Sequence, residues 1–204
     1  MTETTAATFL KIVSGRRGHF RLESGHHSAL WLDLDALFAD QKAIRPFVAS
    51  LVSSLKSHAV SVVCGPLVGG AFLAQLVARE LDAEFCFTEC VMPRETGGMY
   101  QARYRLPNAF EHRVRGQRVA IVDDVMSAGS ALRGTYTDLG THGAIIVVAG
   151  ALLVRGSVGA DWFVERQIPV VAAARDDYEL WAPGDCPLCT KGLRLEDVAA
   201  SPTS

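Results

Sequence analysis

The stretch that decides the fold is Val119-Ala-Ile-Val-Asp123-Asp124-Val-Met-Ser127-Ala128-Gly129-Ser130-Ala131. Its four leading apolar residues predict a buried strand that ends at two adjacent carboxylates. A turn of small residues follows, and residues 132–139 have the pattern of a helix closed by a glycine. This order places acidic side chains and a helix N-terminus at one edge of a sheet, where open α/β folds bind ligands.

The turn after the two carboxylates has the chemistry of a phosphate site. The N–H groups of residues 128–131 and the positive end of the helix dipole suit a phosphate dianion. Ser127 and Ser130 add hydroxyl donors, and Gly129 lets the backbone approach a ligand closely. The carboxylates would repel the phosphate unless they face sugar hydroxyls or a divalent cation, so we expect a ribose 5-phosphate. The alternative is an acidic strand end followed by an ordinary helix N-cap.

The same stretch resembles the ribose-phosphate signature of the type I phosphoribosyltransferases, whose donor is phosphoribosyl pyrophosphate. The resemblance implies that Asp123 and Asp124 hold the ribose hydroxyls and act in catalysis beside the developing positive charge of the sugar. It also implies that the following turn binds the 5-phosphate through Ser127, Ala128, Gly129, Ser130 and Ala131.

Length and composition fit one globular domain. The chain has 204 residues, of which 49% are apolar and 21% charged, which suffices for a substantial core. A net charge of −2 and an isoelectric point near 6.3 give no reason to expect nucleic-acid binding. No apolar run reaches the roughly 18 residues of a membrane span, and the N-terminus lacks a signal-peptide pattern. We expect a cytoplasmic protein with no nucleic-acid or membrane partner.

The order of the predicted elements indicates an α/β fold. Strands that alternate with helices imply a central, mainly parallel sheet flanked by helices, as in the Rossmann-like type I phosphoribosyltransferases. We expect a single phosphoribosyltransferase domain over residues 1–204, with an N-terminal hood over 1–35, a core over 36–195 and a disordered tail over 196–204. The predicted strands of the core are 60–64, 84–88, 119–122, 145–154 and 170–174, and its helices are 41–56, 71–81 and 132–139. In the hood we expect a helix over 5–13 and strands over 19–22 and 30–34.

A second anion site follows the first predicted core strand. The sequence Cys64-Gly-Pro-Leu-Val-Gly-Gly70 lies at the C-terminal end of that strand and opens a helix. The donor carries a pyrophosphate besides its 5-phosphate, so it needs two such loops at one sheet edge. The loop resembles the pyrophosphate loop of the family, which implies ligand contacts by Leu67, Val68, Gly69 and Gly70. The alternative is a tight glycine turn without a ligand.

Two further segments resemble orotate phosphoribosyltransferases. Gly18-His-Phe-Arg-Leu-Glu-Ser-Gly-His-His-Ser28 is similar to their N-terminal segment, with His27 where some members have lysine. Leu152-Leu-Val-Arg155-Gly-Ser157 places an arginine at a strand end, and a guanidinium matches the substrate carboxylate. Val154 stands where the family usually has Asp. The resemblance implies base contacts by His27, Ser127 and Arg155, while an exposed histidine and a surface arginine are the alternatives.

Residues 92–107 correspond to the mobile loop that closes over the pyrophosphate in this family. The family usually has lysines and a histidine there, whereas this chain has neither. Arg94, Arg103 and Arg105 are the candidates to bind the pyrophosphate, and we expect Arg103 and Arg105 to act in catalysis. Gly97-Gly98 supplies the hinge or tip expected of a lid.

The resemblance implies a transferase in which a base nitrogen displaces pyrophosphate from the ribose. We expect Mg2+ to bind mainly through substrate and water, with no direct protein ligand. Orotate is the first choice of base, and another nucleobase is the alternative. A regulator that senses phosphoribosyl pyrophosphate with little catalysis is a third possibility, which the missing loop lysine and histidine motivate. The family also implies a homodimer with shared active sites.

Five cysteines include the pair Cys186-Pro-Leu-Cys189, whose spacing is that of half a zinc site. A tetrahedral site needs two more ligands, and the remaining candidates are scattered along the chain. A partner chain could supply a second pair. We favour a reduced, packed C-terminal turn, and a similar tail occurs in some orotate phosphoribosyltransferases.

Overall fold

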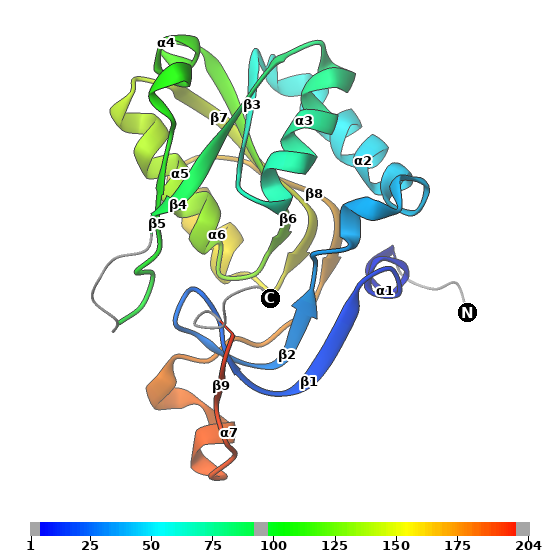
Figure 1. Cartoon of the computed structure of the whole chain (residues 1–204), viewed down its shortest axis with the longest axis vertical. Helices are drawn as coiled ribbons and strands as arrows, with labels where there is room; N and C mark the ends of the chain where they lie inside the picture. Colours follow the sequence, from blue (N-terminus) through cyan, green and yellow to red (C-terminus); the bar gives the residue numbers. More distant parts are fainter. Residues whose placement is uncertain (1–4, 92–97, 199–204) are drawn as a thin grey trace.

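A six-stranded sheet forms the centre of the molecule (Figure 1), in a computed structural model that describes residues 5–91 and 98–198. The strand order is β5-β4-β3-β6-β7-β8, and only β4 and β5 pair antiparallel. The predicted α/β fold with a mainly parallel sheet is confirmed. The strands are β3 (Val62–Pro66), β4 (Glu84–Val91), β5 (Arg103–Arg105), β6 (Arg118–Met126), β7 (Ile145–Arg155) and β8 (Val170–Asp176).

Helices cover both faces of this sheet because successive strand side chains point to opposite sides. On β6, Ala120 and Val122 pack with one group of helices, while Val119 and Ile121 pack with the other. The first group is α1 (Thr5–Leu10), α2 (Gln41–Leu55) and α3 (Gly69–Leu81). The second is α4 (Glu111–Val114), α5 (Ser130–Thr141) and α6 (Val158–Val164). Figure 1 shows the two layers on either side of the strands.

A small three-stranded sheet lies below the core in Figure 1 and forms the hood. Its order is β2-β1-β9, from β1 (Ser14–Arg21), β2 (His27–Asp33) and β9 (Glu196–Asp197). The short helix α7 (Pro187–Thr190) precedes β9. The C-terminal segment therefore belongs to the hood, whereas we had placed residues up to 195 in the core. Helix α1, which was predicted to belong to the hood, packs on the core instead. Its residue Phe9 lies against Phe47 of α2, with ring centroids 5.2 Å apart.

Other boundaries differ from the sequence-based prediction for physical reasons. Strand β6 continues through the two carboxylates to Met126, because β7 extends far enough to pair with it up to Val154. The first helix ends at Leu10 instead of residue 13, since β1 already begins at Ser14. Strand β5 and helix α6 were not predicted, because both are too short for a clear periodic pattern. The disordered tail predicted over residues 196–204 is wrong at its start, because Glu196–Asp197 form β9 by pairing with β1; residues 199–204 lie outside the described residues.

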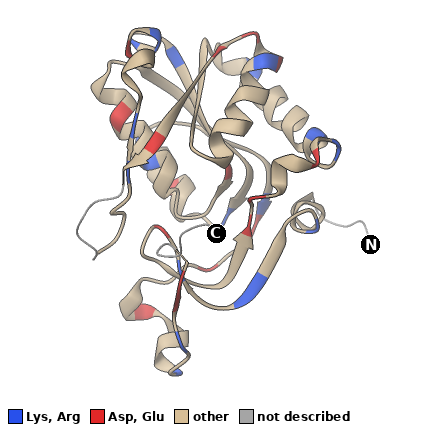
Figure 2. Cartoon of the chain, viewed as in Figure 1, with Lys and Arg blue, Asp and Glu red and all other residues tan. Residues whose placement is uncertain are grey.

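Charged residues of both signs are interspersed over the hood, the helices and the loops (Figure 2). This distribution agrees with the small net charge of the chain. Among the described residues, no helix combines the length and the apolar character required to cross a membrane.

The packing of α2 on the sheet gives a test of the core. Leu51 is fully buried, and its side chain lies against Gly150 of β7. We expect Leu51→Ala to lower the free energy of unfolding by about 2–5 kcal/mol, because it removes apolar contacts and leaves a cavity. Chemical denaturation measures the change. The control is Val164→Ala on α6, which is 61% exposed and should cost less than about 0.5 kcal/mol. Equal losses for both variants would contradict this packing.

Candidate active site

The two predicted anion loops meet at one edge of the sheet. Strands β3 and β6 are parallel neighbours, so the loops that follow them lie side by side. A Cβ atom on Gly69 would lie 1.9 Å from Asp124 Oδ2, and one on Gly70 would lie 2.8 Å from Asp123 Oδ1. Only glycine fits at such distances. The predicted pyrophosphate loop is therefore packed directly on the acid pair that the ribose-phosphate motif supplies.

The acid pair is held by backbone hydrogen bonds at the end of β6. Asp123 Oδ1 accepts the amide N–H of Asp124 at 3.0 Å, and Asp124 Oδ1 accepts that of Val125 at 2.6 Å. Burial raises the pKa of Asp124 to about 6. Burial, followed by repulsion from Asp124, raises the pKa of Asp123 well above its ordinary value. A cation or hydroxyl donors placed beside the pair would stabilise the charged carboxylates. The pair therefore suits a sugar or a metal-bound ligand.

A third acid, which the sequence analysis did not single out, lies beside this pair. Glu23 follows β1 and lines the cavity described below, and partial desolvation raises the pKa of its carboxyl group. The hydroxyl of Tyr104 on β5 donates to Glu23 Oε2 at 3.0 Å. Glu23 also contributes to the raised pKa of Asp123 by like-charge repulsion. Glu23 lies within the segment that resembles orotate phosphoribosyltransferases, and this was the only hint in the sequence. Its neighbour Asp123 is on β6, about 100 residues later, so their proximity could not be predicted.

Hood and core enclose a cavity of about 290 Å³ at this edge. The core contributes Asp123, the turn 127–131 and Arg155. The hood contributes residues of the β1–β2 turn and of β2, among them Glu23 and Trp31. The structure thus brings together the ribose-phosphate turn, one of the paired acids and the predicted base-binding arginine. The loop 67–70 contacts Asp124 but does not line this cavity.

The turn of the ribose-phosphate motif is fixed by a helix that the sequence did not reveal. Gly129 has φ 72° and directly precedes α5, so a side chain there would be strained. The amide of Gly159 in α6 donates to the carbonyl of Ser127 at 2.9 Å. A Cβ on Gly159 would lie 2.6 Å from that same carbonyl oxygen. Close packing of α6 therefore holds the turn in the shape that exposes the α5 N-terminus.

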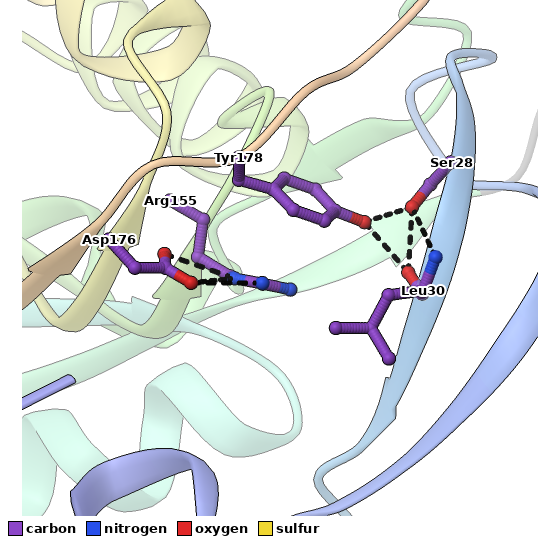
Figure 3. Close-up of polar contacts among 5 residues, drawn as sticks. All are labelled: Ser28, Leu30, Arg155, Asp176 and Tyr178. Carbon is purple, nitrogen blue, oxygen red and sulfur yellow. Dashed lines mark hydrogen bonds and ion pairs between the residues drawn. The ribbon is translucent and has the colours of Figure 1, made fainter. Parts of the chain in front are cut away.

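Arg155 is buried at the end of β7 with an acidic partner (Figure 3). Asp176 of β8 accepts from Nε at 3.1 Å and from Nη2 at 2.9 Å. The guanidinium carbon lies 3.8 Å from the ring centroid of Tyr178, a cation–π contact. The neighbouring strand thus supplies a carboxylate to this arginine although position 154 is valine. Neither Asp176 nor Tyr178 was predicted, because their proximity depends on the pairing of β7 with β8.

Tyr178 also joins the core to the hood (Figure 3). Its hydroxyl donates to the carbonyl of Leu30 on β2 at 2.7 Å and forms a second hydrogen bond with Ser28 Oγ. Ser28 Oγ, which also lies 2.7 Å from this carbonyl oxygen, donates its proton to the Tyr178 hydroxyl. The side chain that stacks on Arg155 therefore also fixes the hood strand that forms the opposite wall of the cavity.

Three more of the predicted site residues, all within the described part of the chain, lie away from this cavity. His27 is buried in the hood, where its Nδ1 faces His19 and Cys189. Arg103 and Arg105 are exposed on β5 and do not line the cavity. Arg94 lies outside the described residues. The roles expected for these four side chains in base and pyrophosphate binding stay predictions.

Comparison with known proteins identifies the family of this chain. A family model described as phosphoribosyl transferase domain matches residues 33–178, which include both anion loops and Arg155. The chain belongs to the phosphoribosyltransferase family. An orotate phosphoribosyltransferase of Thermotoga maritima is 32% identical over 179 residues, 88% of each chain. One from a Thermoanaerobacter species is 30% identical over 193 residues, 95% of this chain and 94% of the relative. The resemblance stated from the motifs is confirmed.

Solved structures confirm the fold of this phosphoribosyltransferase. An orotate phosphoribosyltransferase from Aeropyrum pernix has a TM-score of 0.61 at 22% identity, covering 81% of this chain and 90% of its own. An adenine phosphoribosyltransferase from Thermoanaerobacter pseudethanolicus has a TM-score of 0.65 at 16% identity, covering 84% of this chain and 100% of its own. The backbone is thus shared by enzymes named for different bases, so the choice of base depends on side chains.

The raised pKa of Asp124 predicts a pH-dependent cost to stability. The folded protein holds this proton more tightly than the unfolded chain, whose ordinary pKa is 3.8, so the free energy of unfolding falls as pH rises toward 6. Asp124→Asn removes that cost. We expect the ligand-free variant to be more stable by about 2 kcal/mol at about pH 7.5 and unchanged at about pH 3.5, while turnover falls about tenfold or more. Thermal unfolding at both pH values measures the effect, and a loss of stability at the higher pH would refute it.

Proposed function

We propose that this phosphoribosyltransferase transfers the 5-phosphoribosyl group of phosphoribosyl pyrophosphate to orotate, releasing pyrophosphate and orotidine 5′-phosphate. The observation that carries the proposal is the position of Arg155, which lines one cavity with Asp123 and the turn 127–131. An arginine beside a ribose-phosphate site suits a base that bears a carboxylate. The names of the relatives at 30–32% identity support the same base.

The donor fits across the edge where the two loops meet. Its 5-phosphate would accept from the N–H groups of the turn 127–131 at the start of α5, and its pyrophosphate would lie on the loop 67–70. Asp123 and Asp124 would then hold the ribose hydroxyls. As the bond from ribose to pyrophosphate breaks, positive charge develops on the sugar beside these carboxylates. Positioning of donor and base, together with this charge, accounts for the catalysis we propose.

Arg155 is preorganised to bind the orotate carboxylate with part of its guanidinium group. Asp176 occupies the edge formed by Nε and Nη2. Within residues 5–91 and 98–198, the N–H groups of Nη1 make no hydrogen bond, so they remain to donate to a substrate. The Tyr178 ring fixes the plane of the guanidinium group. A side chain held in this way loses little entropy on binding.

We further propose that Mg2+ accompanies the donor. Asp123, Asp124 and Glu23 would accept hydrogen bonds from water molecules bound to Mg2+ without binding the ion directly. Desolvation raises the pKa of all three carboxyl groups, so a cation nearby would favour their charged forms. Bound mainly through substrate and water, the cation would neutralise charge on the pyrophosphate leaving group. The chain itself would contribute orientation of the ribose and hydrogen bonds to the phosphates.

A homodimer with shared active sites completes the proposal. Arg103 and Arg105 are exposed on β5, which is an edge strand of the sheet, and they lie outside the cavity of their own chain. A second copy could receive these side chains over its pyrophosphate site. The arginines would then supply the positive charge that lysine and histidine provide in other members of the family.

Pyrophosphate release with a panel of bases tests the proposed reaction. The panel contains orotate, uracil, adenine, hypoxanthine and guanine, each with phosphoribosyl pyrophosphate and Mg2+. We expect turnover with orotate alone, since only orotate carries a carboxylate for Arg155. Turnover with another base would place the protein in salvage. No turnover with any base, while the donor still binds, would favour a regulator.

Substitution of Arg155 tests its role in base binding. We expect Arg155→Ala to raise the KM for orotate about 10- to 100-fold with a much smaller change in the KM for the donor, because it removes a charge-assisted hydrogen bond. Steady-state kinetics with each substrate varied gives both constants. The matched control is Arg175→Ala on β8, whose exposed side chain points away from the buried pair. An equal rise in both constants for Arg155→Ala would contradict orotate binding by this residue.

A second variant separates an effect on base binding from an effect on folding. It is needed because removing Arg155 leaves Asp176 buried without its partner. Asp176→Asn breaks the pair but retains the guanidinium group. We expect this variant to change the KM for orotate by less than tenfold, even if its melting temperature falls as far as that of Arg155→Ala. Comparable KM values for the two variants would show that the pair acts only in folding.

A further inference from the structure

Four side chains with metal-ligand chemistry converge in the hood, away from the active-site cavity. His19 of β1, His27 of β2, Cys186 and Cys189 have ligand atoms that all lie within 4.8 Å of one another. The first three residues are buried, while Cys189 reaches the surface. The Cys186–Cys189 pair was recognised in the sequence as half a zinc site. The missing half comes from residues about 170 positions earlier in the chain.

Four of the six distances between these ligand atoms match the edges of a tetrahedral site, and the other two are within 4.8 Å. With Zn–N bonds of about 2.0 Å and Zn–S bonds of about 2.3 Å, the edges are about 3.3 Å between nitrogens and about 3.6 Å between nitrogen and sulfur. His19 Nε2 and His27 Nδ1 are 3.1 Å apart. Cys186 Sγ lies 3.4 Å from His19 Nε2, and Cys189 Sγ lies 3.7 Å from His19 Nε2 and 3.3 Å from His27 Nδ1. All four distances agree with the ideal edges to within a few tenths of an ångström.

The hydrogen bonds around the histidines favour coordination. His19 Nδ1 lies 2.9 Å from the carbonyl oxygen of Leu193, which can only accept, so Nδ1 carries the proton. In a neutral ring this leaves a lone pair on Nε2, directed at the other three ligands. A ligating histidine whose other nitrogen donates to a backbone carbonyl is the usual arrangement in metalloproteins.

The hood also lacks an apolar core that would hold it together. Within its described part, residues 14–35 and 177–198, the buried apolar residues are Phe20 and Cys186. The buried polar residues there are more numerous: His19, Ser24, His26, His27 and Ser28. A small sheet of this kind buries too little apolar surface to be stable without an additional link. A metal bound to four side chains supplies such a link in many small domains.

We propose that the hood carries a structural zinc site formed by His19, His27, Cys186 and Cys189. Zinc suits a ligand set of two imidazoles and two thiolates, and with four protein ligands no position is left for a substrate. The site joins β1 and β2 to the segment around α7. It therefore fixes the C-terminal segment on the hood and supports the β1–β2 turn, whose residue Glu23 lines the cavity. His27 acts here as a metal ligand and does not contact the base.

Metal analysis of the full-length protein, purified without a polyhistidine tag under reducing conditions, tests the site. We expect one zinc ion per chain by elemental mass spectrometry. The variants Cys189→Ser and His19→Ala should lose the bound zinc. Matched controls are Cys90→Ser on β4 and His112→Ala on α4, which lie outside the cluster and should retain it. A wild-type protein free of zinc after growth in zinc-supplemented medium, or variants that retain zinc, would overturn the proposal.

Cobalt substitution gives a second readout that does not depend on variants that fold. Addition of Co2+ to the metal-stripped wild-type protein should produce the ligand-field bands of a tetrahedral site and a thiolate charge-transfer band. Both should disappear on addition of zinc, and zinc but not Mg2+ should restore the melting temperature. Absence of the thiolate band, or a disulfide between Cys186 and Cys189 in the freshly purified protein, would overturn the proposal. Neither result depends on turnover, so a failure of the zinc proposal can be distinguished from a failure of the proposed transferase activity.

Discussion

The close packing of two carboxylates against a glycine turn is the constraint on which the active site depends. Asp124 Oδ2 occupies the space that a side chain at residue 69 would need, and Asp123 Oδ1 does the same at residue 70. This contact exists because β3 and β6 are parallel neighbours whose C-terminal ends reach the same edge. It sets the distance between the two anion loops. It also leaves a pair of acids buried beside each other, with raised pKa values, until a ligand provides compensating charge or hydroxyl groups.

The remaining wall of the cavity depends on how the hood is attached to the core. Tyr178 stacks on Arg155 and at the same time donates to the backbone of β2 at Leu30. The hood itself contains few buried apolar residues, so polar contacts hold it in place. The cluster of two histidines and two cysteines lies where the N-terminal and C-terminal parts of the hood meet. The wall of the cavity where we propose that the base binds is thus the part whose geometry depends most on specific side-chain contacts.

The edge of the sheet belongs to the fold that the family shares, whereas the cavity wall formed by Arg155 and the hood depends on individual side chains. The structures of orotate and adenine phosphoribosyltransferases resemble this chain to a similar degree, although their names imply different bases. The donor site that we propose would use backbone N–H groups and a few acids at the edge of the parallel sheet, and these depend on the common fold. The base would contact Arg155 and the hood, where the acid partner of the arginine comes from β8. A change of base therefore requires changes of side chains at this wall and leaves the sheet intact.

The sequence by itself determined the α/β class, the two anion loops and the acid pair, because each depends on residues adjacent in the chain. A strand, two carboxylates and a small-residue turn predict a phosphate site from local geometry alone. Contacts between distant segments were decided only by the tertiary structure. Asp176 pairs with Arg155 through the register of β7 and β8, and Glu23 reaches Asp123 because the hood folds over the sheet. His27 shows the same limit: its segment was recognised, but Cys186 and Cys189 approach it only when the chain returns to the hood.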